Sequence, residues 1–462
     1  MLFSSLTFLF CFLPAAVVGY YICPRKLRNF FLLLASIFFY AWGEPRYLPV
    51  IFATITISYF GALAVERFKY KKILLTLFIL LDLSLLFYFK YTNFFLENLN
   101  MIFHQKWSLK VVLPLGISFY TFQALSYLVD VYRGQVKAQK NYLKIALYIC
   151  LFPQLIAGPI VKYHDVADQI DNREETIDKV YYGIRRFIIG LAKKVLIANV
   201  VGKIADQIFA LPINEFDAPI AWLGAISYTL QIYYDFSGYS DMAIGLGSIF
   251  GFKFLENFNY PYISQSITEF WRRWHMSLST WFKDYVYIPL GGNRKGRIRT
   301  GINLIIVFFL TGFWHGASWI FILWGLWNGF FILLEKITGW AKKDAGILKK
   351  ILYHVYTILA FIIGWVLFKS ETVLKAKDFL SNMMGMTIGH QVYIKLPNYL
   401  TRFNMIILTV AILCAMPIFK DILNKRSLFV ETIINVILAT LFVMCISELA
   451  INTYNPFIYF RF

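Results

Sequence analysis

The stretch GINLIIVFFLTGFWHGASWIFILWGLWNGFFILLEK, residues 301–336, decides the fold class. It is apolar over nearly its whole length, yet it is too long for one crossing of a bilayer core about 30 Å thick, which takes roughly 20 helical residues. We therefore expect a helix that goes out and a second that returns, with His315 at or near the turn and toward the outer side. An ionisable residue inside a membrane is costly, so this histidine predicts a functional site.

The rest of the chain has the same apolar character. Of its 462 residues 59% are hydrophobic and 15% are charged, whereas a soluble domain carries about a quarter charged residues. Two of the apolar segments, 219–250 and 301–335, are long enough to be helix pairs. We expect an all-α polytopic membrane protein with about 11 to 14 membrane elements, some of them re-entrant. The segments are 5–22, 28–42, 48–65, 73–90, 111–132, 142–160, 187–210, 219–250, 301–335, 351–368, 404–419 and 428–449.

The net charge of +19 is a guide to topology. Alternate connections between the apolar segments hold 27 Lys and Arg residues on one side and 10 on the other. Basic residues collect in cytoplasmic loops, so we expect the N-terminus and the C-terminus outside. The eight basic residues between 161 and 210 are not placed by this argument. A nucleic-acid partner is not expected, because no basic cluster lies away from an apolar segment.

Cysteine and histidine spacing gives no sign of a metal. The five cysteines lie in or beside apolar stretches without a CxxC pair, and no two histidines have metal-ligand spacing. We expect neither a disulfide nor a metal. With no polar linker or repeat, the chain is predicted to form one domain over 1–462, with core signatures at about 111–335 and a C-terminal motif at 455–462.

The polar segment 251–300 carries a second histidine. Ser266 and Glu269 have capping-box spacing, which predicts a helix start and a helix continuing through Tyr285. Helical spacing places His275 among Trp271, Trp274, Leu278 and Phe282, opposite Arg272, Met276, Ser279 and Lys283. An interfacial helix that only anchors the protein explains the aromatic and basic faces equally well. The loop that follows, with Arg294 and Lys295, fits either phosphate binding or a cytoplasmic topology signal.

The chemistry of His315 is suited to proton transfer, since an ordinary imidazole titrates near neutral pH. Gly312 and Gly316 would let a substrate or another backbone approach it. The alternative is a packing histidine that bonds a nearby carbonyl. In YYDFSGYSDM, residues 233–242, Asp235, Ser237, Tyr239 and Asp241 either line a tunnel or cap helices broken near Gly238 and Gly245.

Several long motifs carry a resemblance. FWRRWHMSLSTWFKDYVYIPLGG (270–292) and LTGFWHGASWIFILWGLWNG (310–329) resemble the paired signatures of the membrane-bound O-acyltransferase family. Further motifs are similar to its bacterial branch, which O-acetylates polysaccharides such as alginate and peptidoglycan. They are PLGISFYTFQALSYLVDVYRG (114–134), FPQLIAGPIVKY (152–163), YYDFSGYSDMAIGLGSIFGF (233–252) and NPFIYFRF (455–462).

The resemblance implies a ring of helices around a transmembrane tunnel in a bacterial cytoplasmic membrane. It implies that acetyl-CoA enters from the cytoplasm as donor substrate, with no permanently bound cofactor. An extracytoplasmic partner of the SGNH/GDSL acetyltransferase type and a polysaccharide acceptor are also implied. His315 takes the place of the family's catalytic histidine, and His275 that of the second signature. We expect the phosphates of coenzyme A to be held by Arg272, Arg273, Lys283, Arg294 and Lys295.

The C-terminal motif offers a further hypothesis. Tyr459 carries the only side-chain hydroxyl of the last six residues, and it could receive the acetyl group transiently and pass it to the partner. An aromatic anchor at the membrane interface explains the same residues. Two other functions remain open: a D-alanyl or other acyl transferase that uses a thioester-loaded carrier protein, and a transporter with a histidine proton relay, although matching halves are not seen.

Overall fold

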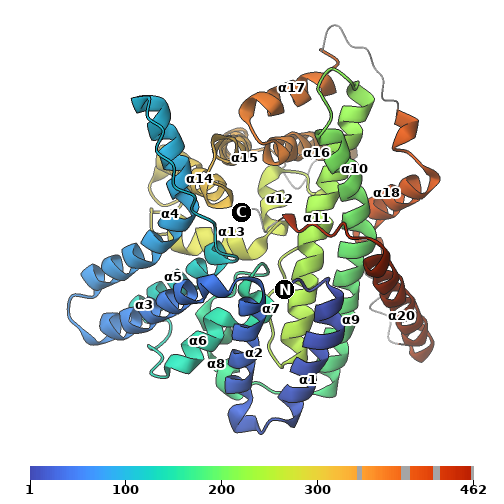
Figure 1. Ribbon diagram of the computed structural model, residues 1–462. Helices are drawn as coiled ribbons and strands as arrows, with labels where there is room; N and C mark the ends of the chain where they lie inside the picture. The colour runs from blue at the N-terminus through green and yellow to red at the C-terminus, as the bar shows by residue number, and fades with distance from the viewer. Residues whose placement is uncertain (341–345, 387–395, 420–426, 459–462) are drawn as a thin grey trace. The chain divides into compact units, whose positions relative to one another are not determined.

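The computed structural model describes residues 1–340, 346–386, 396–419 and 427–458, and these residues form helices and connections without a β-strand (Figure 1). The chain divides into two compact units. Unit 1 comprises residues 1–187 and 239–256, and unit 2 comprises residues 188–238 and 257–458. The single domain expected from the sequence stays a prediction, as does the ring around a tunnel.

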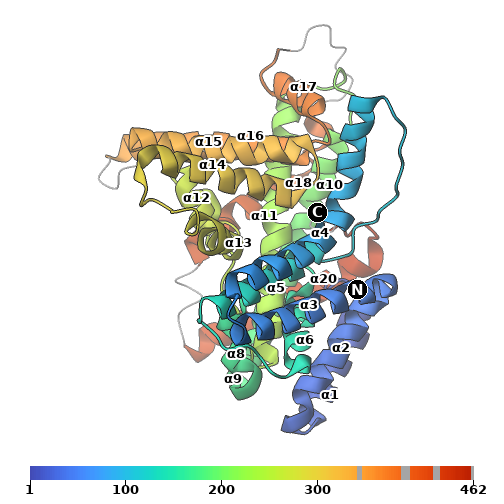
Figure 2. The ribbon, with the colours of Figure 1, turned by 90° about the vertical axis from the view of Figure 1, so that its left-hand side faces the viewer.

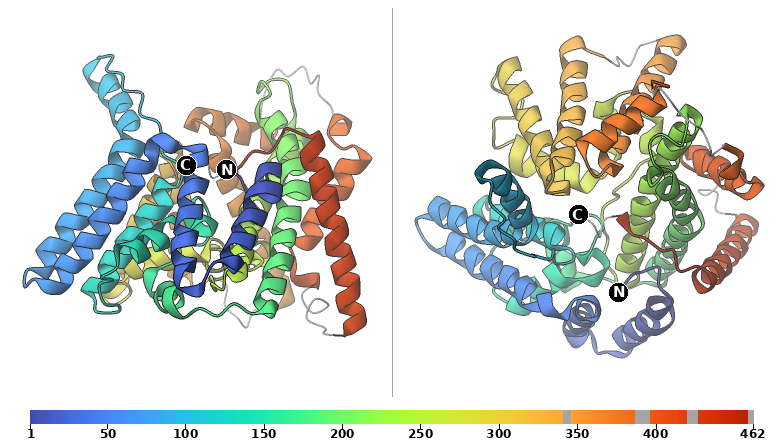
Figure 3. Two further views of the ribbon diagram at one scale, coloured as in Figure 1. Left: turned by 60° about the horizontal axis from the view of Figure 1, so that its bottom comes forward. Right: turned by 45° about the horizontal axis from the view of Figure 1, so that its top comes forward.

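Unit 1 is built from the N-terminal helices. The long helices α3 and α4 lie side by side, and α5 packs against both of them (Figure 3). The helices are α1 (Leu13–Ile22), α2 (Arg28–Gly43), α3 (Leu48–Arg67), α4 (Lys71–Phe103), α5 (Ile117–Tyr132), α6 (Tyr142–Cys150), α7 (Phe152–Leu155), α8 (Tyr163–Asn172) and α9 (Ile177–Ala192), whose last residues belong to unit 2.

Unit 2 holds both histidines of interest. Helices α14 and α15 make an extensive contact and run side by side (Figure 2). The helices are α10 (Asn199–Phe209), α11 (Ala218–Ile249), α12 (Ile267–Arg273), α13 (Met276–Phe282), α14 (Gly296–His315), α15 (Trp319–Thr338), α16 (Ile347–Lys369), α17 (Val373–Met383), α18 (Arg402–Cys414) and α20 (Leu428–Ile451). The last residues of α11 belong to unit 1.

Six helices of the described residues are long and apolar enough to cross a membrane. They cover Pro45–Arg67, Lys71–Phe103, Gly296–His315, Trp319–Thr338, Ile347–Lys369 and Leu428–Ile451, and shorter apolar helices cover Phe8–Ile22 and Arg402–Cys414. Large apolar side chains such as Phe60, Leu80, Val436 and Val443 are exposed on these helices, as expected of surfaces that face lipid. The chain is therefore an all-helical, polytopic membrane protein.

The two long apolar segments behave differently. Residues 301–335 form the expected pair, α14 and α15, but the segment expected at 219–250 forms one helix of 32 residues, Ala218–Ile249. The expected helix break near Gly238 and Gly245 is therefore wrong. These glycines instead allow close helix contact within each unit, because a Cβ on Gly238 would overlap the Gly190 carbonyl and one on Gly245 the Gly183 carbonyl.

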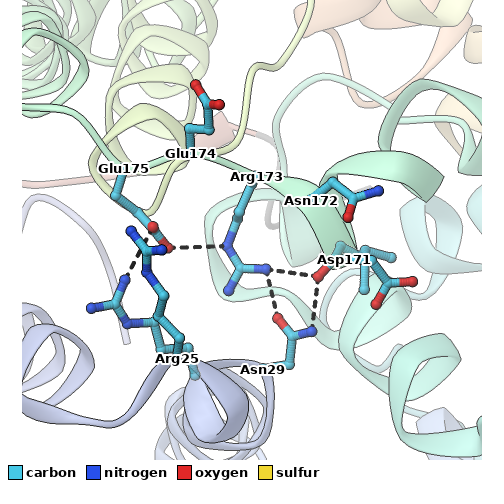
Figure 4. A pocket seen from close by; sticks show the side chains of 9 residues that line it. Arg25, Asn29, Asp171, Asn172, Arg173, Glu174 and Glu175 are labelled. Atoms are coloured by element: carbon cyan, nitrogen blue, oxygen red, sulfur yellow. Dashed lines mark hydrogen bonds and ion pairs between the residues drawn. The ribbon is translucent and has the colours of Figure 1, made fainter.

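A polar cluster in unit 1 joins three of its N-terminal elements (Figure 4). The guanidinium of Arg173 donates hydrogen bonds to the Tyr20 hydroxyl at 3.0 Å and to the Asn29 side-chain oxygen at 2.6 Å. Glu175 accepts a hydrogen bond from the Tyr20 hydroxyl and forms an ion pair with Arg28 at 3.0 Å. The cluster borders a cavity of about 350 Å³ and ties the end of α1 and the start of α2 to the segment after α8.

Candidate functional site

The signature helix α12 begins as predicted. The Ser266 hydroxyl oxygen accepts a hydrogen bond from the Glu269 amide at 2.9 Å. The Glu269 carboxylate reaches back to the amide of Gln265 at 3.0 Å, one residue before the usual capping-box position. The capping interaction is therefore confirmed, with the reciprocal bond shifted by one residue.

The continuous helix expected through Tyr285 is wrong. Helix α12 ends at Arg273, and α13 starts at Met276. Between them Trp274 is extended, and His275 has a φ of 42°, in the left-handed region that non-glycine residues rarely adopt. The chain therefore turns at the histidine itself, and the two faces predicted from one helical period do not exist as such.

Asn257 holds this turn. Its backbone carbonyl accepts a hydrogen bond from the Met276 amide at 2.9 Å, and its side-chain oxygen accepts from the Ser277 amide at 3.2 Å and the Ser277 hydroxyl at 2.9 Å. These bonds satisfy the first donors of α13, which a helix start otherwise leaves without partners. They offset the cost of the left-handed residue, roughly 1–3 kcal/mol.

The same oxygen contacts His275. Oδ1 of Asn257 lies 3.2 Å from Nδ1 of the imidazole. Because that oxygen only accepts, Nδ1 is the nitrogen that carries the proton in the neutral ring. Burial lowers the pKa of His275 to about 3, so the imidazole is neutral near pH 7, with Nε2 as the basic nitrogen.

The aromatic residues around His275 lie in the interior of unit 2. His275 is fully buried, and the Phe236 ring meets it edge to face at 4.6 Å between centroids. Trp271, Trp274, Leu278 and Phe282 are also buried. The segment therefore packs within the protein, and the alternative of an amphipathic helix that only anchors in the membrane interface is wrong.

His315 lies at the turn between two transmembrane helices, as predicted. It is the last residue of α14, and α15 starts at Trp319. Its side chain is 1% exposed. The rings of Trp324 and Phe368 meet it edge to face, at 5.0 and 5.3 Å between centroids.

One indole contacts both histidines. The ring centroid of Trp314 lies 4.9 Å from that of His315 and 6.3 Å from that of His275. The two predicted site residues, 40 positions apart in the sequence, are thereby brought together in unit 2. A proton or an acyl group handled at this place would be largely shielded from water.

The glycines next to His315 bring helices together. A Cβ on Gly312 would overlap the Phe321 carbonyl, and one on Gly325 would overlap the Phe308 carbonyl. A Cβ on Gly316 would overlap the Phe321 ring. Of the two expected uses, close approach of another backbone is therefore the one observed for Gly312, as is usual for small residues between membrane helices.

Besides Asn257, two further supporting residues were missed in the sequence. Glu335, buried near the end of α15, accepts hydrogen bonds from the amides of Ile267 and Thr268 at 2.5 and 2.9 Å. Asn328 accepts from the Trp271 indole at 3.1 Å. Both lie on α15 and bind α12, which is about 60 residues away in the sequence. The only sequence signal for them is a polar residue within an apolar run.

The basic residues predicted to bind phosphates lie mostly at the surface. Arg273 is paired with Glu269 at 2.9 Å. Lys283 borders a largely apolar cavity of about 150 Å³ together with Trp271, Phe282 and Thr311. Arg272, Lys283, Arg294 and Lys295 are exposed. Their role in donor binding stays a prediction.

The buried carboxylates of α11 are paired. Asp235 forms an ion pair with Lys194 at 2.5 Å in unit 2, and Asp241 pairs with Arg186 at 2.6 Å in unit 1. Neither caps a broken helix. Tyr459, the third predicted catalytic residue, lies outside the described residues.

Known proteins match this chain over most of its length. The model of the membrane-bound O-acyltransferase family matches residues 68–368, which include both histidines. The chain belongs to this family. It is therefore an acyltransferase and a multi-pass integral membrane protein.

Several relatives of this membrane-bound O-acyltransferase are named for O-acetylation. A probable alginate O-acetylase of Pseudomonas syringae is 46% identical over 81% of this chain and 73% of its own length. The corresponding protein of Pseudomonas putida is 40% identical over the full length of both chains. A peptidoglycan O-acetyltransferase of Helicobacter pylori is 37% identical over 91% of this chain and 87% of its own.

Proposed function

We propose that this chain moves acetyl groups from cytoplasmic acetyl-CoA toward a cell-wall or secreted polysaccharide. The observation that carries the proposal is the pair of buried histidines against one indole, within the residues that the O-acyltransferase family model matches. The full-length similarity to alginate O-acetylases supports acetyl as the acyl group and a polysaccharide as its destination.

His315 acts as the general base in this proposal. It takes the proton from an acceptor hydroxyl as the oxygen attacks the thioester carbonyl, and it returns the proton to the departing thiolate. A C–O bond forms, the C–S bond breaks, and free coenzyme A leaves as the thiol. General acid–base catalysis of this kind contributes about 10²–10⁴-fold to a rate.

His275 is proposed to orient or polarise the thioester, or to relay the proton. Asn257 fixes its Nδ1 proton, so Nε2 is the basic nitrogen assigned to that work. A relay through a neutral imidazole fits its low pKa, because the ring would not hold a proton between turnovers.

Donor binding is assigned to the surface cations. Arg272, Lys283, Arg294 and Lys295 are exposed, and Arg273 is half-buried beside Glu269. Charge-assisted hydrogen bonds to phosphate suit this set, with arginine able to bind through two donors at once. Coenzyme A is substrate here and no resident cofactor is proposed.

The outer half of the reaction is assigned to the C-terminal end. We infer that Tyr459 receives the acetyl group as an ester and passes it to an extracytoplasmic partner of the SGNH/GDSL type, which acetylates the polysaccharide. In this proposal the chain lies in a bacterial cytoplasmic membrane with both termini outside, an orientation that the excess of basic residues on one side supports.

Purified protein in nanodiscs, supplied with acetyl-CoA labelled in the acetyl group, tests the proposal. We expect thiol release and label on the protein or on added polysaccharide and partner. Turnover only with an acyl-loaded carrier protein would contradict acetyl-CoA as donor and favour a D-alanyl-type reaction. Proton-coupled uptake of a solute without thioester loss would favour a transporter.

A further inference from the structure

The end of the described chain is held to unit 2 at several points. After α20, the Tyr454 hydroxyl donates a hydrogen bond to the Asp206 carboxylate at 2.5 Å. The Asn455 side-chain oxygen accepts one from the Asn199 amide group at 3.3 Å. Phe457 is buried, with its ring centroid 6.0 Å from the Lys194 ammonium. Residues 454–458, which we name the C-terminal strap, therefore run along α10 and the π-helical segment before it.

A buried ion pair makes two further hydrogen bonds to the strap. Lys194 and Asp235 are 3% and 1% exposed at their side chains and lie 2.5 Å apart. The Lys194 ammonium also donates to the Pro456 carbonyl, and the second Asp235 oxygen accepts from the Ile458 amide at 2.8 Å. Each partner of the pair thus binds the backbone of the strap.

Binding of the strap explains this buried ion pair better than a contribution to the free energy of unfolding does. Removing two charges from water costs about as much as their attraction returns, so apolar side chains stabilise an interior at least as well. The spare hydrogen-bonding atoms of this pair are used on the strap. Lys194 also lies in a π-helical segment, Lys193–Ala198, a local distortion that is frequent at functional sites.

We propose that Lys194 and Asp235 are positioning residues that dock the C-terminal strap in a fixed register. Lys194 binds a carbonyl and Asp235 binds an amide two residues later, so the direction of the strap is fixed as well as its place. This inference rests on the proposed function, in which Tyr459, the residue directly after the strap, receives the acetyl group. Docking then presents that residue, and turnover depends on it.

Three variants separate docking from stability. Lys194→Asp/Asp235→Lys restores a buried ion pair but places a carboxylate at the Pro456 carbonyl and an ammonium at the Ile458 amide. Lys194→Met/Asp235→Leu keeps an apolar interior without either bond. Tyr454→Phe/Asn199→Ala leaves the ion pair intact and removes other strap contacts. The matched control is Glu371→Leu/Lys375→Met, an exposed pair at the start of α17.

Each variant is measured in three ways. Thermal unfolding in detergent reports the fold. The rate of maleimide labelling of Ile458→Cys, located by mass spectrometry of the C-terminal peptide, reports docking. Mass spectrometry of the same peptide, with Ile458 retained and acetyl-CoA added, reports acetylation of Tyr459.

We expect the charge-swapped and apolar variants to unfold close to the wild-type temperature. In both, the cysteine at position 458 should be labelled about tenfold faster, and acetylation of Tyr459 should fall about tenfold. Tyr454→Phe/Asn199→Ala should show a smaller change in the same direction, and the control no change. Wild-type labelling in a charge-swapped or apolar variant that folds would overturn the proposal. If neither folds, labelling that is about tenfold faster in Tyr454→Phe/Asn199→Ala would do so, because that variant keeps the ion pair and should hold the strap nearly as well as wild type. Wild-type protein that never acetylates Tyr459 would contradict the proposed acceptor, while the labelling rates still decide the docking.

Discussion

Nδ1 of His275 lies 3.2 Å from the side-chain oxygen of Asn257, and this contact sets both the shape and the protonation of the site. The oxygen also binds the first residues of α13. The left-handed turn at His275 and the tautomer of its ring therefore depend on one side chain.

Replacing Asn257 with alanine should lower turnover more than it raises KM. A buried donor left without its partner costs about 1–3 kcal/mol, which corresponds to roughly 5- to 150-fold in rate. Steady-state thiol release from acetyl-CoA measures both constants. Asn172→Ala, at an exposed position of α8, is the control, and equal kinetics for the two variants would show that the contact with His275 is not used.

Glu335 should matter for stability. Its carboxylate accepts two amides at the start of α12, so Glu335→Ala leaves buried donors without partners, at about 1–3 kcal/mol. We expect a clearly lower unfolding temperature in detergent. Glu371→Ala removes an exposed ion pair worth about 0.3–0.5 kcal/mol and should scarcely change it. A similar shift in both variants would argue against the capping role.

The glycine contact between α14 and α15 should be intolerant of a larger side chain. Gly325→Val inserts a branched group against the Phe308 carbonyl and should cost about 1–3 kcal/mol through overpacking, with displacement of His315 and a loss of activity. Gly346→Ala is the control for this variant, because a Cβ at that glycine has no atom within 4 Å. Activity of Gly325→Val near that of Gly346→Ala would contradict the close packing.

His164 should make stability depend on pH. Hydrogen bonding to Asp130 at 2.7 Å, and to Asp165, raises its pKa to about 9 from 6.5. Stability from the protonated ring is therefore complete below about pH 6.5 and is lost as the pH rises through about 9. The difference in unfolding temperature between wild type and His164→Asn should be largest near pH 6 and shrink toward pH 10. A difference independent of pH would refute the assignment.

The helix pair around His315 could be predicted because length and hydrophobicity alone decide it. A run of apolar residues longer than one bilayer crossing must turn, and its central histidine falls at the turn. The start of α12 was also readable, since Ser266 and Glu269 interact locally. Such features depend on neighbours within a few residues.

The turn at His275 could not be predicted in the same way. It depends on Asn257, 18 residues earlier, and on a backbone conformation that sequence statistics disfavour for histidine. The single helix α11 was missed because an apolar run with glycines looks the same whether it breaks or packs against α9. Glu335 supports α12 from 68 residues away.

Thiol release from acetyl-CoA by His315→Asn tests the central claim most directly. The variant should fold, since the change removes no large volume, and it should lose about 10²–10⁴-fold in turnover at saturating donor. His104→Asn, at an exposed histidine, should turn over at the wild-type rate. Turnover of His315→Asn within about twofold of wild type, well short of the general-base contribution, would contradict the assignment of His315 as the catalytic base.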